Sequence, residues 1–193
     1  MRFDPDRHRR RSLRLKSYDY SQAGGYYVTV VAQDRESLFG EVTSQTMRLN
    51  DAGRMVDSVW RDLALFYPGV RLDAFVVMPN HIHGVLFLVG ATPRGCPPGG
   101  GRRGEEGQAR GPAPTASLSL PDVVHRFKTL TTRRYIEGVK QQGWMTFRAR
   151  LWQRNYHEHV IRDEESLALI REYIANNPAG WAEDQENPGR LGP

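Results

Sequence analysis

Cysteine is almost absent from this chain, since Cys96 is the single thiol among 193 residues. One cysteine excludes an intrachain disulfide and the cysteine-based zinc finger, and it agrees with a reducing compartment. No apolar run reaches the roughly 20 residues that a membrane span requires, and the N-terminus lacks the apolar segment of a signal peptide. We therefore expect a soluble, cytoplasmic protein with no membrane partner.

The charge of the chain is concentrated at its start. The net charge is +5 and the isoelectric point is about 9.6. Residues 1–16 hold seven Arg or Lys and two Asp, so this arm accounts for the whole net charge. A short Arg-rich arm commonly holds a phosphate backbone, although a merely solvated tail has the same composition. We favour nucleic acid as the partner, with contacts from Arg9, Arg10, Arg11, Arg14 and Lys16.

Composition also predicts how the chain is divided. Its length suits one domain with a sizeable core. We expect a basic N-terminal arm over residues 1–20, a single domain over 21–182 and a tail over 183–193. Residues 90–117 are rich in Gly, Pro and Arg, a composition that cannot pack a core, and we expect a flexible insertion there.

The spacing of apolar residues predicts an α+β fold. We expect strands at 26–32, 72–77, 84–89 and within 151–161, and helices at about 44–66, 119–137 and 163–176. The order strand, helix, strand, strand, helix, strand is the ferredoxin-like βαββαβ pattern, an antiparallel sheet with helices on one face. A further helix follows the last strand.

The tripeptide His81-Ile82-His83 is the first candidate for chemistry. Residues i and i+2 of a strand share one face, so the two imidazoles are expected side by side. They form either a metal-ligand pair or two ordinary strand histidines. A histidine-triad hydrolase needs a third histidine where this chain has Val85, and that class is therefore excluded.

Tyrosines and basic residues add further candidates. Tyr173 and Asn177 are four residues apart and share a helix face if the helical geometry extends that far. Taken alone, Tyr173 is more simply a core aromatic. The helix predicted at 119–137 is markedly basic, and its candidates for phosphate contact are Arg126, Lys128, Arg133 and Arg134. Basic residues on a helix are also commonly its solvated face.

Three blocks, taken in order, resemble a known family. They are Pro79-Asn80-His81-Ile82-His83, then Leu151-Trp152-Gln153 with His159-Val160-Ile161-Arg162, then Tyr173-Ile174-Ala175-Asn176-Asn177-Pro178. Together they resemble the REP-associated tyrosine transposases, single-tyrosine relatives of the smallest insertion-sequence transposases within the His-hydrophobic-His endonucleases. The resemblance covers about residues 10–180, apart from the insertion.

The resemblance implies a ferredoxin-like enzyme that nicks and rejoins single-stranded DNA, at sites that form hairpins. By position, His81, His83 and Asn177 would hold Mg²⁺ or Mn²⁺, and Tyr173 would form a 5′-phosphotyrosine. Such a protein would be a monomer or a homodimer and would associate with the nucleoid. Tyr135 and Tyr156 lie outside the tyrosine block, and His157 with His159 repeats the His-x-His spacing as a decoy pair.

Two other functions stay open on the sequence. The first is a catalytically silent DNA-binding regulator on the same fold. The second is a metal-dependent RNA-processing protein that uses the metal pair and the arm without Tyr173.

Overall fold

A four-stranded antiparallel sheet forms the centre of the protein. The computed structural model describes residues 18–89 and 118–190. The strands are β1 (Gly24–Val31), β4 (Val70–Val77), β5 (His81–Leu88) and β6 (His157–Ile161), in the order β4-β5-β1-β6. This order and the βαββαβ succession confirm the predicted ferredoxin-like α+β fold.

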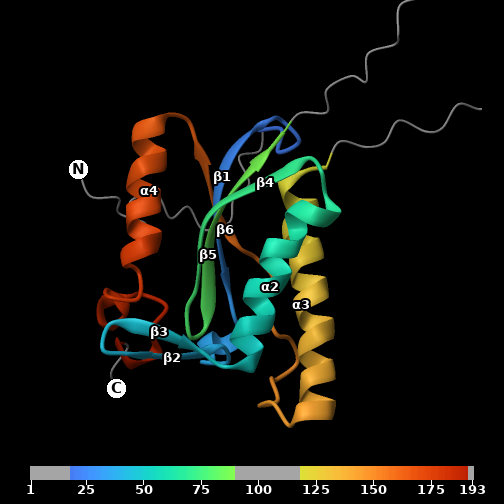
Figure 1. Ribbon diagram of the computed structural model, residues 1–193, viewed down its shortest axis with the longest axis vertical. Helices are drawn as coiled ribbons and strands as arrows, with labels where there is room; N and C mark the ends of the chain where they lie inside the picture. The colour runs from blue at the N-terminus through green and yellow to red at the C-terminus, as the bar shows by residue number, and fades with distance from the viewer. Residues whose placement is uncertain (1–17, 90–117, 191–193) are drawn as a thin grey trace, which may run out of the picture.

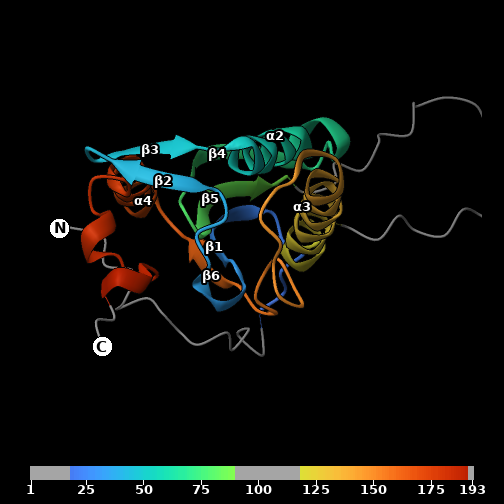
Figure 2. The same ribbon diagram turned by 90° about the horizontal axis from the view of Figure 1, so that it is seen from below.

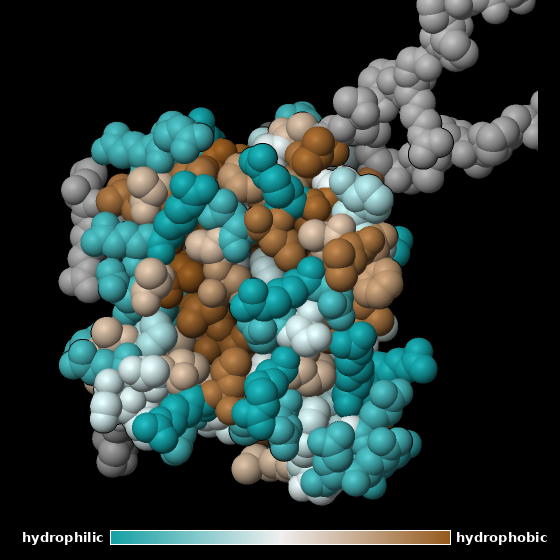
Figure 3. Space-filling model, in the orientation of Figure 1, coloured by the Kyte–Doolittle hydropathy of each residue, from teal (hydrophilic) through white to brown (hydrophobic). Residues whose placement is uncertain are grey.

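The helices lie on both faces of this sheet. Helices α2 (Asp51–Phe66) and α3 (Leu120–Gln142) cover one face, and the added helix α4 (Glu164–Asn176) covers the other (Figures 1 and 2). The strands alternate accordingly: Tyr26 and Val28 join the core under α2 and α3, whereas Tyr27 packs with α4. Between α4 and α2, apolar surface gathers in a strip (Figure 3).

The helix predicted from residue 44 begins later, and this part of the prediction is wrong. Residues 40–49 form a hairpin of β2 (Gly40–Thr43) and β3 (Thr46–Leu49). Ser44 and Gln45 make its turn with φ of 50° and 62°. Helix α2 starts after Asn50, whose side chain accepts a hydrogen bond from the backbone N–H of Gly53 at 2.8 Å. The Met47 spacing that suggested a helix therefore belongs to a strand.

The other predicted elements agree more closely with the structure. Helix α3 begins after Ser119 as expected and runs about one turn past residue 137, to a left-handed Gly143 with φ of 68°. Asp163 caps α4 through the backbone N–H of Ser166. The last strand occupies only the second half of 151–161, since β6 starts at His157. In the first half, Trp152 forms only an isolated β-bridge to Ala32.

Residues 183–190, assigned to a tail by composition, pack against the domain. They begin with the last residue of the short helix η2 (Trp181–Glu183) and include η3 (Pro188–Arg190). Glu186 is buried and its carboxylate accepts a hydrogen bond from Arg35 Nε at 2.7 Å. Arg35 lies in the short helix η1 (Gln33–Arg35) that follows β1. This ion pair fixes the C-terminal segment against the end of β1.

Several predictions lie outside the described residues. They are the five cationic contacts of the arm, namely Arg9, Arg10, Arg11, Arg14 and Lys16, together with Cys96 and the insertion at 90–117. The division of the chain at 20 and 182 stays a prediction. No helix among the described residues combines the length and apolar character that crossing a bilayer requires.

Candidate active site

The two histidines of β5 lie side by side on the face covered by α4. Both are buried, and their Nε2 atoms are 3.0 Å apart. Two nitrogen ligands at about 2.1 Å from a shared ion stand about 3 Å apart when they subtend the right angle of octahedral geometry. The expected placement of His81 and His83 is thus confirmed, and their spacing fits two ligands of one divalent ion.

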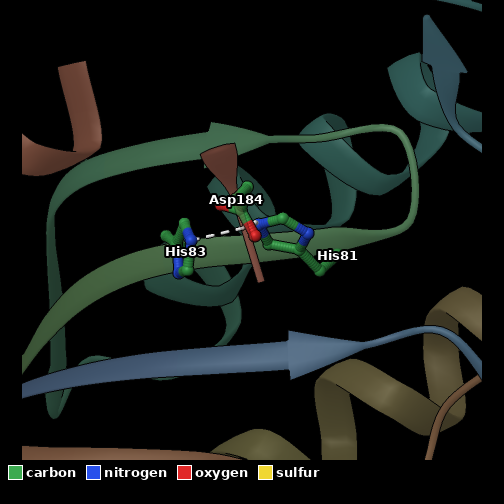
Figure 4. A group of neighbouring side chains, drawn as sticks. All are labelled: His81, His83 and Asp184. Atoms are coloured by element: carbon green, nitrogen blue, oxygen red, sulfur yellow. Dashed lines mark hydrogen bonds and ion pairs between the residues drawn. The ribbon is translucent and has the colours of Figure 1, made fainter. Parts of the chain in front are cut away.

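Asp184 completes a group of three ligand atoms with this pair. One ligand atom from each of His81, His83 and Asp184 lies within 4.8 Å of the others, and Figure 4 shows the three side chains converging. The carboxylate Oδ2 is 3.9 Å from His81 Nε2. The Asp184 side chain is only 7% exposed. Two imidazoles and a carboxylate form a donor set suited to divalent metal ions.

Asn177, the residue expected as the third ligand, lies beside Asp184. Its backbone keeps helical geometry, with φ of −59°, so it stands one turn after Tyr173 as required. Its Nδ2 donates to Asp184 Oδ2 at 3.3 Å. Its Oδ1 is buried and makes no hydrogen bond to any described residue. A buried amide oxygen left without a donor is suited to a cation.

Asn80 determines which nitrogen of His81 carries the proton. The amide nitrogen Nδ2 donates to the backbone carbonyls of Arg35 at 2.9 Å and Glu186 at 2.7 Å. Its Oδ1 is therefore the atom that faces His81 Nδ1, at 2.8 Å, and it must accept a hydrogen bond from the N–H of that nitrogen. The lone pair of His81 is consequently on Nε2, which points at His83 and Asp184.

His83 is held by two hydroxyl groups of β1. Its Nδ1 lies 2.7 Å from the Tyr27 hydroxyl and 2.8 Å from Thr29 Oγ1. The antiparallel register pairs Thr29 with His83 and Tyr27 with Val85, which brings both hydroxyls to this nitrogen. These contacts orient the ring so that Nε2 faces the site.

Tyr173 reaches the same point from α4. Its hydroxyl lies 3.5 Å from His83 Nε2, and its ring packs edge-on against the His83 ring with centroids 5.3 Å apart. Leu167, Ile170 and Ile174 on the same helix are buried against the sheet, so the packing of α4 sets the depth of the phenol. A phenol, two imidazoles and a carboxylate thus meet in one place.

An ion pair ties α4 to the edge of the sheet. Arg171 donates from Nε and Nη2 to the two carboxylate oxygens of Asp73, at 2.7 Å each. The hydrogen bonds from Arg171 hold the pKa of the Asp73 carboxyl below its usual value. Asp73 lies where the β4–β5 pairing shifts register, between Leu72 and Phe75. The pair fixes the helix two residues before Tyr173.

The four basic residues predicted on α3 each have a partner inside the domain. Arg126 lies over the Tyr67 ring, Arg133 pairs with Glu137 and Arg134 pairs with Asp62. The Lys128 ammonium donates to the backbone carbonyls of Gln153, Arg154 and Asn155 at 2.9, 3.3 and 3.0 Å. Their contact with DNA stays a prediction.

The rival residues stand apart from the His81 and His83 group. The Tyr135 hydroxyl donates to the Met145 carbonyl, and burial raises the pKa of Tyr135 to about 12. Tyr156 lies under the Lys128 ammonium. Among the described residues, the metal-capable group of three contains neither His157 nor His159.

Sequence reasoning missed Asp184, Tyr27 and Thr29. Asp184 follows the last helix in a stretch without periodicity, and nothing in its spacing marks it as a ligand. The sequence does indicate that Tyr27 and Thr29 share a face, because residues i and i+2 of a strand do so. Their position opposite His83 depends on the strand register, which comes from the fold.

Comparisons with known proteins found two relatives of similar sequence. An uncharacterized protein of Haemophilus influenzae is 38% identical over 181 residues, which cover 92% of this chain and 93% of that protein. A second protein of that organism, a "Putative REP-associated tyrosine transposase", is 24% identical over 163 residues, covering 83% of this chain and 73% of its own length. No protein-family model matches the chain.

A solved structure shares the fold. It is a REP-associated tyrosine transposase bound to a REP hairpin, with a TM-score of 0.50 at 18% identity, over 86% of this chain and 73% of that one. Three observations agree with one another. They are the ferredoxin-like sheet, the relatives that align with most of this chain, and the order of the three sequence motifs. The chain is thus similar in sequence to one protein named as a REP-associated tyrosine transposase and shares the fold of another.

Proposed function

We propose that this protein is a DNA-nicking and joining enzyme of the transposase type, in which Tyr173 forms a covalent bond to DNA. The observation that carries the proposal is the position of the Tyr173 hydroxyl, 3.5 Å from a histidine of the His81, His83 and Asp184 group. A metal-dependent nuclease that used water would need no phenol at that place.

The chemistry follows from these residue types. The Tyr173 oxygen attacks the phosphorus of a phosphodiester, a bond from oxygen to phosphorus forms, and the bond from phosphorus to the 3′ oxygen breaks. The phenol loses its proton, and the departing 3′ oxygen gains one and becomes a free hydroxyl. The product is a 5′-phosphotyrosine, which conserves the phosphodiester bond energy, so that the reverse attack by a 3′ hydroxyl rejoins the strand without ATP.

The residues fit a divalent metal ion. His81 Nε2, His83 Nε2 and the Asp184 carboxylate would hold it, with the Asn177 amide beside them. A bound Mg²⁺ or Mn²⁺ would withdraw charge from a phosphate oxygen and favour loss of a nearby phenolic proton. A phenol has a reference pKa near 10, so Tyr173 needs such help at neutral pH. Imidazole ligands favour transition metals, so we expect Mn²⁺ to bind more tightly than Mg²⁺.

We propose single-stranded DNA with hairpin structure as the substrate, and a nucleoid location follows from that substrate. The structural relative is itself bound to a REP hairpin. The basic arm at residues 1–16 suits a phosphate backbone. A monomer or a homodimer is compatible with this proposal.

One experiment tests it. The full chain is incubated with end-labelled single-stranded hairpin DNA and Mn²⁺, and covalent adducts are separated on a denaturing gel. We expect an adduct that Tyr173→Phe abolishes and His81→Ala greatly reduces, whereas Tyr135→Phe retains it. Cleavage that survives Tyr173→Phe contradicts the tyrosine mechanism, and binding without an adduct would support the silent regulator instead.

A further inference from the structure

A groove beside α3 lies on the other face of the sheet from Tyr173, and the proposed chemistry does not use it. It encloses about 860 Å³ between α3 and the segment 147–154. Such a volume falls within the range of about 300–1,000 Å³ that is typical of ligand sites.

The floor of this α3 groove is apolar. Leu151 and Trp152 are buried at its base, and Ile136 is 39% exposed along its wall. Phe147 also lines it and packs edge-on against Tyr135. Flat aromatic and aliphatic surface of this kind accepts the face of an unpaired base without regard to its identity.

The rim of the groove is cationic. Lys140, Arg150 and Arg154 line it and are exposed, and none of them forms an ion pair with another described residue. Arg133 also lines the groove, but its Nε is paired with Glu137 Oε1 at 3.3 Å. Glu137 is the one acidic residue among the described residues that line the groove. An apolar floor bordered by exposed cations complements unpaired bases joined by phosphates.

The shape of the rim is built into the fold. The half-buried Lys128 ammonium donates to the carbonyls of residues 153–155, which fixes the backbone that carries Arg154. Ala149, next to Arg150, holds a left-handed backbone with φ of 60°. Residues other than glycine rarely adopt this conformation, and it persists where the surrounding structure imposes it.

The backbone that lines the groove is hydrogen-bonded to the end of β1, which lies beside the active site. Gln153 N–H donates to the Val31 carbonyl and Ala32 N–H donates to the Asn80 carbonyl. The register pairs Val31 with His81. The wall of the groove is therefore joined through the end of β1 to the histidine pair.

We infer that the α3 groove binds a single-stranded nucleic-acid segment next to the strand that reacts at Tyr173, with bases on the apolar floor and phosphates at Arg150 and Arg154. This inference extends the proposed function, because it assigns a path to the substrate. It also identifies phosphate contacts different from the four that were predicted on α3.

Binding measured without catalysis tests the groove by itself. The full chain is titrated into fluorescently labelled oligothymidine in EDTA, and anisotropy is followed at several salt concentrations. We expect Arg150→Ala/Arg154→Ala to weaken binding about tenfold or more. We also expect it to lower the slope of log affinity against log salt by about 1.4, since each contact to a single strand contributes about 0.7. The matched control Arg61→Ala/Arg162→Ala removes the same charge from positions outside the groove, and it should bind nearly as the wild type does.

Two further arms distinguish other occupants. An abasic oligonucleotide keeps the phosphates and lacks the bases, and we expect the wild type to bind it several-fold more weakly. An acidic peptide, poly-glutamate, should compete poorly. Groove variants that bind oligothymidine like the control, equal binding of the abasic strand, or preferential capture of poly-glutamate would each overturn the inference.

The result is independent of the adduct assay. Loss of binding in the groove variants without any Tyr173 adduct in the wild type would keep the groove and refute the transposase chemistry. If the wild type forms the adduct and the groove variants bind normally, the transposase chemistry is supported and the groove inference is refuted.

Discussion

The side-chain oxygen of Asn80 lies 2.8 Å from Nδ1 of His81, while the same amide donates to two backbone carbonyls. The amide cannot turn around without losing both of those bonds. One residue therefore fixes the tautomer of the histidine and connects it to Arg35 and to the segment that carries Asp184. Outer partners of this kind set the basicity and direction of a metal ligand.

Replacing Asn80 should weaken metal binding. Asn80→Ala leaves His81 free to change tautomer and leaves two carbonyls without their donor. We expect Mn²⁺ affinity, measured by titration calorimetry, to fall about 10–100-fold. The free energy of unfolding should fall by about 1–3 kcal/mol. Asn155→Ala, at an exposed position, is the control, and an equal loss there would argue against this role.

The third ligand can be identified by comparing two substitutions. Asp184→Asn removes the anionic ligand, and we expect Mn²⁺ affinity to fall by on the order of a hundredfold or more, beyond the effect of an outer partner. Asn177→Ala removes a neutral amide and should cost less. Glu183→Gln, an exposed acidic neighbour, should leave the affinity unchanged. A larger loss in Asn177→Ala than in Asp184→Asn would make the amide the principal ligand.

The ion pair between Asp73 and Arg171 should control the position of Tyr173. Asp73→Asn breaks the tie between β4 and α4, so we expect slower formation of the DNA adduct with Mn²⁺ affinity retained. Asp57→Asn loses a pair with Arg61 inside α2 and should react normally. Equal rates in both variants would show that packing alone sets the tyrosine.

The same pair predicts a dependence on acid. The pKa of Asp73 is lowered in the folded protein, chiefly by the hydrogen bonds from Arg171, so the stabilisation is present above the ordinary value of 3.8. It is lost as the pH falls through the lowered folded pKa, because the unfolded state then binds protons first. The difference in unfolding free energy between wild type and Asp73→Asn should shrink in that range, as denaturant titrations at several pH values would reveal.

Lys128 predicts a dependence on alkali. Burial lowers its pKa from 10.5 to about 8. Between these values the unfolded state keeps a proton that the folded state has lost, so stability rises with pH. Compared with Lys128→Gln, the wild type should gain on the order of 2 kcal/mol between pH 8 and pH 10.5. A difference between the two proteins that does not change with pH would contradict the lowered pKa of Lys128.

The sequence alone determined the order of the four strands of the central sheet and the three long helices, and the pairing of the two histidines. Strand alternation is a local property, so His81 and His83 had to share a face wherever the strand lay. Helical spacing likewise placed Asn177 one turn after Tyr173. The hairpin at 40–49 was not predicted, because its Met47 also fits a helical spacing and only the turn at Ser44 and Gln45 resolves the ambiguity.

Tertiary structure decided which of these residues meet. The sheet order places β1 beside β5, and that register brings Tyr27 and Thr29 to His83. Packing of α4 on the far face carries Tyr173 across ninety positions of sequence to the same histidine. The Arg35–Glu186 pair then folds back the segment that delivers Asp184. Contacts between distant segments depend on how faces pack, and no spacing along the chain records them.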